Sequence, residues 1–181
     1  MGSTWGNRIK ISVFGESHGP AIGVVIDGLP SGVSIDEAGI IKEMQRRAPG
    51  SQAGSTPRKE ADLPTVLSGI YNGKTTGTPL AMEILNTNTH SSDYDGFTVT
   101  PRPGHADYTA EVKYHGFQDV SGGGHFSGRL TAPLCVAGGI CRQFLSEQGI
   151  RIQARIAAIG DICDEGEMIG SVEEKEFPTV S

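Results

Sequence analysis

The stretch that decides the fold spans residues 8–27 and reads RIKISVFGESHGPAIGVVID. Apolar and polar residues alternate strictly from Arg8 to Val13, which is the pattern of a strand with one buried face. A second apolar run covers Ala21–Ile26, and glycines bound the stretch Gly15–Gly19 between the two runs. Two strands joined by such a stretch predict a β-hairpin whose loop carries His18.

Further strands are predicted outward from this hairpin. Apolar runs and alternation place them at Thr65–Ile70, Leu80–Asn86 and Arg151–Ile159, whereas residues 87–104 are polar and rich in turn formers. Because the strands follow one another as hairpins and not through regular crossover helices, we expect an antiparallel α+β fold. A chain of 181 residues is long enough to bury a core of its own.

Two helix starts are predicted from capping residues. Ser34 with Glu37 three positions later is a capping box, and the helix that follows should end near Arg47. Asp107 resembles the N-cap of a short helix that ends near Gly116. Both helices are therefore expected to begin at a side chain that accepts a backbone hydrogen bond.

A longer helix is predicted over residues 130–148. Glycine inside a helix costs about 1 kcal/mol relative to alanine, so Gly138 and Gly139 predict close packing against another helix. We expect this helix to present one stripe to the core: Leu130, Leu134, Ala137, Cys141, Phe144 and Gln148.

Charge and composition exclude several classes of protein. The net charge is −6, and residues 161–176 hold most of the acidic excess, whereas residues 42–59 are basic. The basic segment lacks interleaved aromatic residues, so it predicts a site for small anions and not for nucleic acid. No segment is long and apolar enough for a membrane span. Three cysteines without metal-type spacing fit a reducing, cytoplasmic location, and we assign no metal site.

Three segments could carry chemistry. His18, in the hairpin loop, could donate a proton to a leaving group. His105 follows Arg102 and precedes a predicted helix, whose positive end would favour the neutral ring. Gly122–Gly124, followed by Arg129, could present backbone N–H groups to a phosphate. Each segment also has a simpler interpretation: an exposed loop histidine, a capped loop–helix junction and a flexible connection.

Four motifs together resemble the chorismate synthase family. They are Gly15–Gly19 with the glycines that follow it, Lys74–Pro79, Arg102–Tyr108 and Gly122–Arg129. The resemblance extends over residues 5–159, and four motifs in the same order are far more specific than one glycine loop.

The resemblance implies a fold and a reaction. The family fold sandwiches helices between two antiparallel sheets, and full-length members assemble as homotetramers. They are lyases that convert 5-enolpyruvylshikimate 3-phosphate to chorismate and phosphate by anti-1,4-elimination, on the shikimate pathway to aromatic amino acids. They require reduced FMN, for which NADPH is a possible reductant. Residues 1–160 would be the N-terminal half of such a domain, and the acidic segment 161–181 would lead into a second half.

The resemblance also implies roles for individual residues. His18 would donate a proton to the leaving phosphate, and His105 would lie near the flavin and donate to its reduced ring. The residues expected to contact FMN are His125, Phe126 and Ser127. Those expected to bind the anionic groups of the substrate are Arg47, Arg58, Arg102 and Arg129.

Some positions depart from the family pattern. Ala48 stands where a third consecutive arginine is common, and Ala53 stands where a further basic residue usually follows. The family's later arginine–aspartate motif is absent from the 181 residues, so we expect the chain alone to be inactive. A non-catalytic remnant that binds anions or flavin is the alternative, and a generic phosphate-binding domain built on Gly122–Gly124 is a third hypothesis.

Overall fold

The computed structural model describes residues 2–48, 61–87, 100–166 and 179. The chain divides into two compact units, Met1–Phe144 and Leu145–Ser181. All predicted site residues belong to the first unit. The predicted division near residue 160 stays a prediction.

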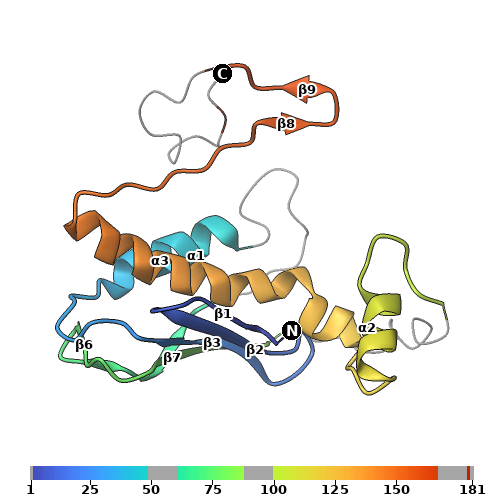
Figure 1. The fold of residues 1–181 in the computed structure, drawn as a ribbon, viewed down its shortest axis with the longest axis horizontal. Helices are drawn as coiled ribbons and strands as arrows, with labels where there is room; N and C mark the ends of the chain where they lie inside the picture. Colours follow the sequence, from blue (N-terminus) through green and yellow to red (C-terminus); the bar gives the residue numbers. More distant parts are fainter. Residues whose placement is uncertain (1, 49–60, 88–99, 167–178, 180–181) are drawn as a thin grey trace. The chain divides into compact units, whose positions relative to one another are not determined.

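A five-stranded antiparallel sheet forms the base of the first unit (Figure 1). Its strands, in spatial order, are β1 (Thr4–Trp5), β2 (Lys10–Gly15), β3 (Ala21–Asp27), β7 (Leu80–Leu85) and β4 (Thr65–Ser68). The expected antiparallel α+β class is confirmed. The described residues contain this one large sheet, and no second large sheet of a sandwich is present among them.

The predicted hairpin is formed by β2 and β3. Val13 pairs with Val24 across the hairpin, and β2 begins two residues later than the alternation suggested. Gly23 pairs with Phe14, and a Cβ atom at Gly23 would lie 2.3 Å from Cζ of the Phe14 ring. Glycine is therefore required inside β3 because the Phe14 ring crosses over it.

Helix α1 (Glu37–Arg47) ends at the predicted residue but has a different N-cap. The side chain of Asp36 accepts a hydrogen bond from the backbone N–H of Ala38 at 3.0 Å, so the predicted cap at Ser34 is wrong. The backbone N–H of Ile35 donates to the carbonyl of Gly73 at 2.9 Å. This pairing holds the segment around Ser34 extended and delays the helix by two residues.

Helix α3 (Thr131–Glu147) lies within one residue of its predicted bounds, and the predicted stripe is confirmed at Leu130 and Ala137 but not along its whole length. Leu134, expected in the stripe, is exposed. The buried positions are Ala132, Pro133, Val136, Ala137, Gly139 and Ile140. A Cβ atom at Gly139 would lie 3.7 Å from Cα of Ile40 in α1, which confirms close helix packing there, whereas Gly138 has open space. Small residues thus decide which face approaches α1.

The remaining elements are short. In the first unit they are β5 (Ile70–Tyr71), β6 (Lys74–Thr75), α2 (Asp107–Tyr114) and two 3₁₀ helices, η2 (Ser121–Phe126) and η3 (Gly128–Leu130). The second unit holds β8 (Ala158–Ile159) and β9 (Ile162–Cys163), which pair with each other. The predicted strand over Arg151–Ile159 is wrong except for its last two residues, because only those find a neighbouring strand among the described residues.

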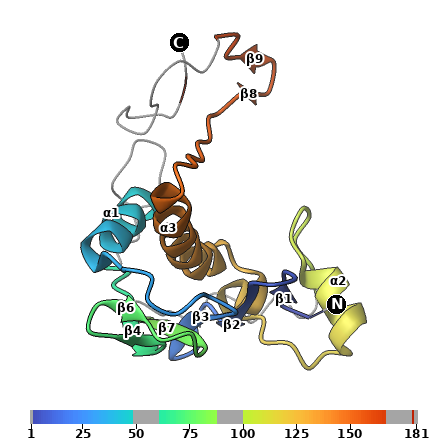
Figure 2. The same cartoon turned by 60° about the vertical axis from the view of Figure 1, so that its left-hand side comes forward.

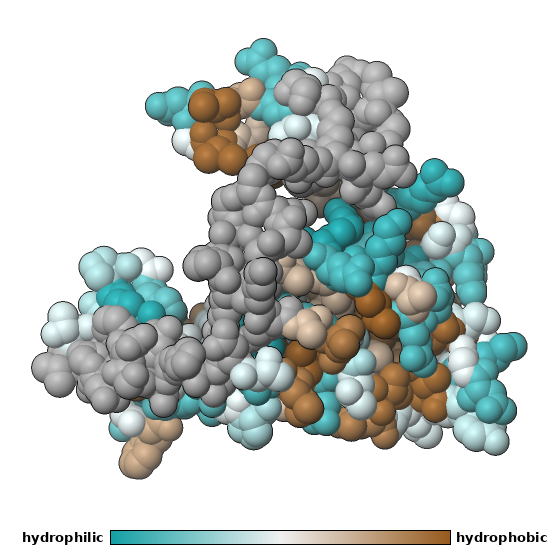
Figure 3. Space-filling view, turned by 180° about the vertical axis from the view of Figure 1, so that it is seen from behind, coloured by the Kyte–Doolittle hydropathy of each residue, from teal (hydrophilic) through white to brown (hydrophobic). Residues whose placement is uncertain are grey.

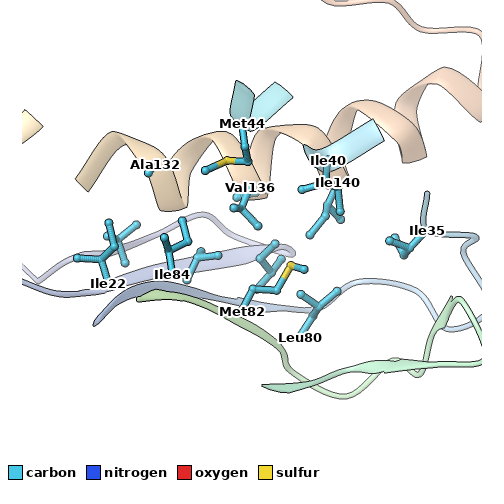
Figure 4. Packing of buried hydrophobic residues seen from close by; sticks show 14 of the residues in the cluster. Ile22, Ile35, Ile40, Met44, Leu80, Met82, Ile84, Ala132, Val136 and Ile140 are labelled. Atoms are coloured by element: carbon cyan, nitrogen blue, oxygen red, sulfur yellow. The ribbon is translucent and has the colours of Figure 1, made fainter. Parts of the chain in front are cut away.

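The core lies between the sheet and the two long helices. Figures 1 and 2 show α1 and α3 side by side on one face of the sheet. In Figure 4, Ile22 and Ile84 lie on the sheet side near Ala132 of α3, and Met82 and Leu80 lie on the sheet side below Val136 and Ile140. All of these side chains are at most 2% exposed. Full burial of one such side chain contributes about 1.5 to 3 kcal/mol. This core makes the ends of β2, β3 and β7 a firm support for the loops that follow them.

The surface separates into polar and apolar areas. Seen from behind in Figure 3, apolar residues gather over the sheet, and hydrophilic residues lie above them. Leu67 lies in the edge strand β4 and Leu63 lies just before it, and both are more than half exposed. No helix among the described residues is long and apolar enough to cross a membrane.

Candidate functional site

The three-glycine segment Gly122–Gly124 lies at the centre of the site. All three glycines have positive φ (62°, 85° and 53°), a conformation that side chains disfavour. The glycines do not stand at the N-terminus of the long helix, because η3 separates them from α3. The segment instead makes room for two histidines.

His18 and His105 lie against neighbouring glycines of this segment. A Cβ atom at Gly122 would come within 1.9 Å of Nδ1 of His18. A Cβ atom at Gly123 would lie 3.0 Å from Cε1 and Nε2 of His105. The structure therefore brings together the two histidines that the sequence singled out, although they are far apart along the chain.

The loop that carries His18 is tied to the same segment. The backbone N–H of Ser17 donates to the carbonyl of Gly124 at 3.1 Å. Ser17 is 1% exposed, and its Oγ finds no hydrogen-bond partner among the described residues. A buried hydroxyl without a partner is unusual and suggests a ligand contact. Sequence reasoning did not assign Ser17 a role, because burial of a loop serine has no signature in the sequence.

His105 belongs to a charged triad with Arg102 and Asp107. Nδ1 of His105 is 2.6 Å from Oδ1 of Asp107, and Nε of Arg102 donates to Oδ2 at 2.8 Å. The Arg102 hydrogen bonds hold the pKa of Asp107 well below its usual range, so this carboxylate accepts. Nδ1 of His105 is thus the donor to Asp107, and Nε2 lies on the side of Gly123 with NH2 of Arg102 at 3.5 Å. In the neutral ring Nε2 is the acceptor atom.

Asp107 is the first residue of α2 and not its cap. The N-cap is Ala106, which makes no side-chain hydrogen bond, so the predicted cap is wrong. The carboxylate also accepts from the backbone N–H of Arg102 at 2.9 Å. An arginine five residues upstream therefore competes successfully for the carboxylate that the helix terminus would otherwise use.

Arg47 and Arg129 meet at one buried carboxylate, that of Asp62. NH1 of Arg47 donates to Oδ2 at 2.7 Å, and NH1 of Arg129 donates to Oδ1 at 2.8 Å. The Asp62 side chain is 0% exposed, and that of Arg129 is 5% exposed. Sequence reasoning found both arginines but missed Asp62. Arg58, the fourth arginine predicted for the substrate, lies outside the described residues.

His125, Phe126 and Ser127 differ in what they can offer a ligand. Nδ1 of His125 donates to the carbonyl of Gly15 at 2.8 Å, and Nε2 is 2.6 Å from Oγ of Ser3, so both ring nitrogens are engaged. Oγ of Ser127 accepts from the backbone N–H of Arg129 and caps η3. The Phe126 ring is 36% exposed.

A cavity of about 330 Å³ opens beside Phe126. The residues that line it are Ser3, Gly15, Glu16, Tyr114, Phe117, Gln118, Asp119, His125 and Phe126. Three aromatic rings make it suitable for a planar group. Its lining includes neither lysine nor arginine, so it offers no strong contact for a phosphate group.

Metal binding and thiol chemistry find little support in the described residues. They contain no group of three or more histidine, cysteine, aspartate or glutamate residues placed to hold a metal ion. Burial raises the pKa of the Cys135 and Cys141 thiols, which reduces their thiolate fraction.

Comparisons with known proteins identify the family. The family model described as chorismate synthase matches residues 9–180. The chain belongs to the chorismate synthase family. Chorismate synthase of Parabacteroides distasonis is 52% identical over 160 residues, which are 88% of this chain and 44% of that protein. Chorismate synthase of Thermococcus kodakarensis is 45% identical over 157 residues, or 87% of this chain and 44% of that protein.

A solved structure supports the same conclusion. A crystal structure of chorismate synthase matches 84% of this chain and 38% of its own length, with a TM-score of 0.59 and 26% identity. The resemblance recognised in the sequence is thereby confirmed. This chain spans less than half the length of the chorismate synthases that it matches.

Two features of the site fit the flavin that chorismate synthases are expected to use. The buried Oγ of Ser17 is available for a hydrogen bond, and Gly123 leaves the space that a side chain would fill next to His105. The aromatic cavity beside Phe126 adds a surface for a planar ring. Because lysine and arginine are absent from that cavity, the fit concerns the ring and not the phosphate of FMN.

Proposed function

We propose that this chain supplies the N-terminal half of a chorismate synthase active site. The reaction is the conversion of 5-enolpyruvylshikimate 3-phosphate to chorismate and phosphate by anti-1,4-elimination with reduced FMN. The observation that carries the proposal is the convergence of His18 and His105 on Gly122 and Gly123. Membership of the chorismate synthase family supports the choice of substrate.

His18 is assigned to the departing phosphate. The carbon–oxygen bond breaks and the phosphate leaves with the electron pair, so a proton donor beside the leaving oxygen favours departure. The positive φ values of the glycine segment and the lack of a side chain at Gly122 let the imidazole approach closely. General acid catalysis of this kind contributes about 10² to 10⁴-fold to a rate.

His105 is assigned to the flavin ring. When bound, reduced FMN would supply an electron transiently and take the proton that leaves the substrate carbon. Asp107 accepts from Nδ1 of His105 and so orients Nε2 as the contact atom. Phe126 would pack on the flavin ring. Both ring nitrogens of His125 already contact Gly15 and Ser3, so His125 would hold these two residues in place.

The arginines are assigned to the substrate's phosphate and two carboxylates. Arg47 and Arg129 are held by Asp62, and Arg102 by Asp107, so each guanidinium is oriented before a ligand arrives. Preorganised guanidinium groups bind carboxylate and phosphate oxygens well because their geometries match. Arg58 remains a prediction for the same group of contacts.

The 181-residue chain alone is expected to be inactive, because it covers only 44% of the length of the matched relatives. Incubation with substrate and chemically reduced FMN under anaerobic conditions should release no phosphate. Turnover by the unmodified chain would contradict this expectation. Reduction by NADPH, a homotetramer and a cytoplasmic location also stay predictions for the complete protein.

A hybrid enzyme tests the proposed function directly. The segment of Parabacteroides distasonis chorismate synthase that matches this chain can be replaced by the corresponding 160 residues, which are 52% identical. We expect the hybrid to form chorismate, and His18→Ala in it to lower kcat at least 100-fold. The control is His115→Ala, since His115 is the C-cap of α2 and has no place in the site.

The hybrid also distinguishes a catalytic role for this chain from the alternative of a non-catalytic remnant that binds anions or flavin. Ala48 favours a remnant because it stands where the family commonly has a third arginine. A hybrid that folds and binds reduced FMN but forms no chorismate would support the remnant. If Ala48→Arg then restores turnover, the loss of substrate contacts is the cause.

A further inference from the structure

Asn86 connects the loop that carries His18 to the strand β7. Asn86 directly follows β7, and its side-chain Nδ2 donates to the carbonyls of Gly19 at 2.7 Å and Glu16 at 3.0 Å. Its backbone N–H donates to the carbonyl of Pro20 at 3.1 Å. One residue therefore holds both ends of the loop.

The other side of the Asn86 amide faces the buried ion pairs. Its Oδ1 accepts a hydrogen bond from Nε of Arg129. Arg129 in turn donates to Asp62, which also binds Arg47. A continuous chain of hydrogen bonds thus runs from α1 through Asp62, Arg129 and Asn86 to the His18 loop.

The chemistry of the amide allows one orientation only. The carbonyl oxygen must face the arginine, which has only donors, and the NH₂ group must face the two backbone carbonyls, which have only acceptors. A flipped amide would place donor against donor and acceptor against acceptor. The position of Arg129 is therefore coupled to the position of the loop through a rigid planar group.

The loop is also held by the glycine segment. Ser17 donates to the carbonyl of Gly124, and Gly122 lies against the His18 ring. Between these two supports, a small displacement of the loop would move the imidazole off Gly122 or into it. Displacements of about 1 Å in an active site can cost about 100-fold in rate.

We propose that Asn86 is a positioning residue: it sets the place of His18 and couples it to the arginines that Asp62 holds. The proposal rests on the proposed function for the role of His18, but the geometry can be tested without any substrate. Asn86 itself is not assigned a contact with the substrate.

Two substitutions of Asn86 distinguish the hydrogen bonds of its Nδ2 from that of its Oδ1. Asn86→Asp keeps an acceptor for Arg129 and removes both donors to the loop, whereas Asn86→Ala removes all side-chain hydrogen bonds. The control is Asn7→Ala, an exposed asparagine outside the network. Because Asn86→Asp retains a strong partner for Arg129, it provides a folded variant even if Asn86→Ala does not fold.

The first measurement uses the 181-residue chain and no ligand. The ring signals of His18 and His115 are followed by NMR at fixed pH, with the His18 signals assigned through His18→Ala. We expect Asn86→Asp to shift or broaden the His18 ring signals and to leave those of His115 unchanged. Unchanged His18 signals in Asn86→Asp would overturn the proposal, whatever substrate the protein uses.

The second measurement uses the hybrid enzyme and a double-mutant cycle. We expect Asn86→Asp to lower kcat at least 10-fold and to change KM for 5-enolpyruvylshikimate 3-phosphate by less than 3-fold. In a His18→Ala background the same substitution should have no further effect on kcat, because both act through one group. Equal losses in the two backgrounds would show that Asn86 acts independently of His18 and overturn the proposal.

The two measurements distinguish the two hypotheses. Displaced His18 signals in a hybrid that forms no chorismate would support the positioning role and contradict the proposed function. An active hybrid whose His18 signals and kcat ignore Asn86→Asp would support the proposed function and contradict the positioning role.

Discussion

His18 and His105 reach the same glycine segment but are held by different forces. The His18 loop is fixed by neutral hydrogen bonds from Asn86, which lead to the fully buried carboxylate of Asp62. His105 is held by Asp107, whose partner Arg102 is 28% exposed. Hydrogen bonds between neutral groups and ion pairs at a fully buried carboxylate respond little to salt, whereas partly exposed ion pairs respond to salt and pH. The position of His18 should therefore depend little on salt and pH, whereas the ion pair that holds His105 should weaken at high salt or low pH.

The strongest test of this contrast is Asp62→Asn. It weakens two ion pairs at a carboxylate that is 0% exposed and removes the negative charge that the buried Arg129 faces there. We expect a loss of about 3 to 5 kcal/mol in the free energy of unfolding. Urea denaturation measures it, and the loss should change little between low and high salt.

Glu43 offers a matched control for Asp62. It also joins two arginines, Arg46 at 2.8 Å and Arg142 at 2.6 Å, but its side chain is 25% exposed. Glu43→Gln should cost no more than about 1 kcal/mol, because partly exposed ion pairs are solvated and screened. Equal losses at Asp62 and Glu43 would mean that burial does not distinguish the two clusters.

Gly122→Ala should displace His18. The new Cβ would lie 1.9 Å from Nδ1 of His18, and φ at this position is +62°. Overpacking and backbone strain together should cost about 3 kcal/mol. Thermal or urea denaturation measures the loss, and the NMR signals of the His18 ring should move. Gly128→Ala, with nothing within 4 Å, is the control.

Gly123→Ala makes the same change next to His105 and should have a smaller effect. The new Cβ would lie 3.0 Å from two atoms of the ring, which can shift slightly, and φ is +85°. Backbone strain then dominates, at about 1 to 2 kcal/mol. If urea denaturation shows a larger loss of unfolding free energy for Gly123→Ala than for Gly122→Ala, the His105 ring is packed more tightly against its glycine than the His18 ring, contrary to this expectation.

Asp107→Asn should show the pH dependence of the His105 side. Because the pKa of Asp107 is lowered in the folded state, the carboxylate adds stability above its unfolded pKa of about 3.9 and loses it as pH falls below that value. We expect Asp107→Asn to cost about 1 kcal/mol at pH 7, discounted for the exposure of Arg102. In urea melts, the difference from the unsubstituted chain should shrink below pH 4 and in high salt.

The periodic elements of the fold could be predicted because their signals are local. Alternation identified β2 and a continuous apolar run identified β3, and the extents of α1 and α3 were predicted within one or two residues. The capping residues were not predicted, because contacts with residues outside the helices decided them. Pairing with Gly73 held the Ser34 segment extended, and Arg102 took the carboxylate of Asp107.

Part of the site could also be predicted, because some of its residues stand in local sequence motifs. His18, His105, Arg102 and Arg129 stand in glycine-containing motifs, and Arg47 stands in a basic segment, so they could be found in the sequence. Asp62 and Asn86 stand in no such motif, and their importance comes from contacts with Arg129, 67 and 43 residues away. A buried carboxylate and a half-buried amide acquire their partners only when distant segments meet.

By itself, the sequence determined the antiparallel α+β class, the two helices that cover the sheet and the chorismate synthase family. Hydrophobic periodicity and short glycine-rich motifs carry this information because each depends on neighbouring residues. The tertiary structure alone decided that two histidines share one glycine segment, that Asp62 joins Arg47 to Arg129, and that Asn86 holds the His18 loop. Hydrogen bonds between distant segments depend on how the chain folds back on itself, and no local pattern specifies them.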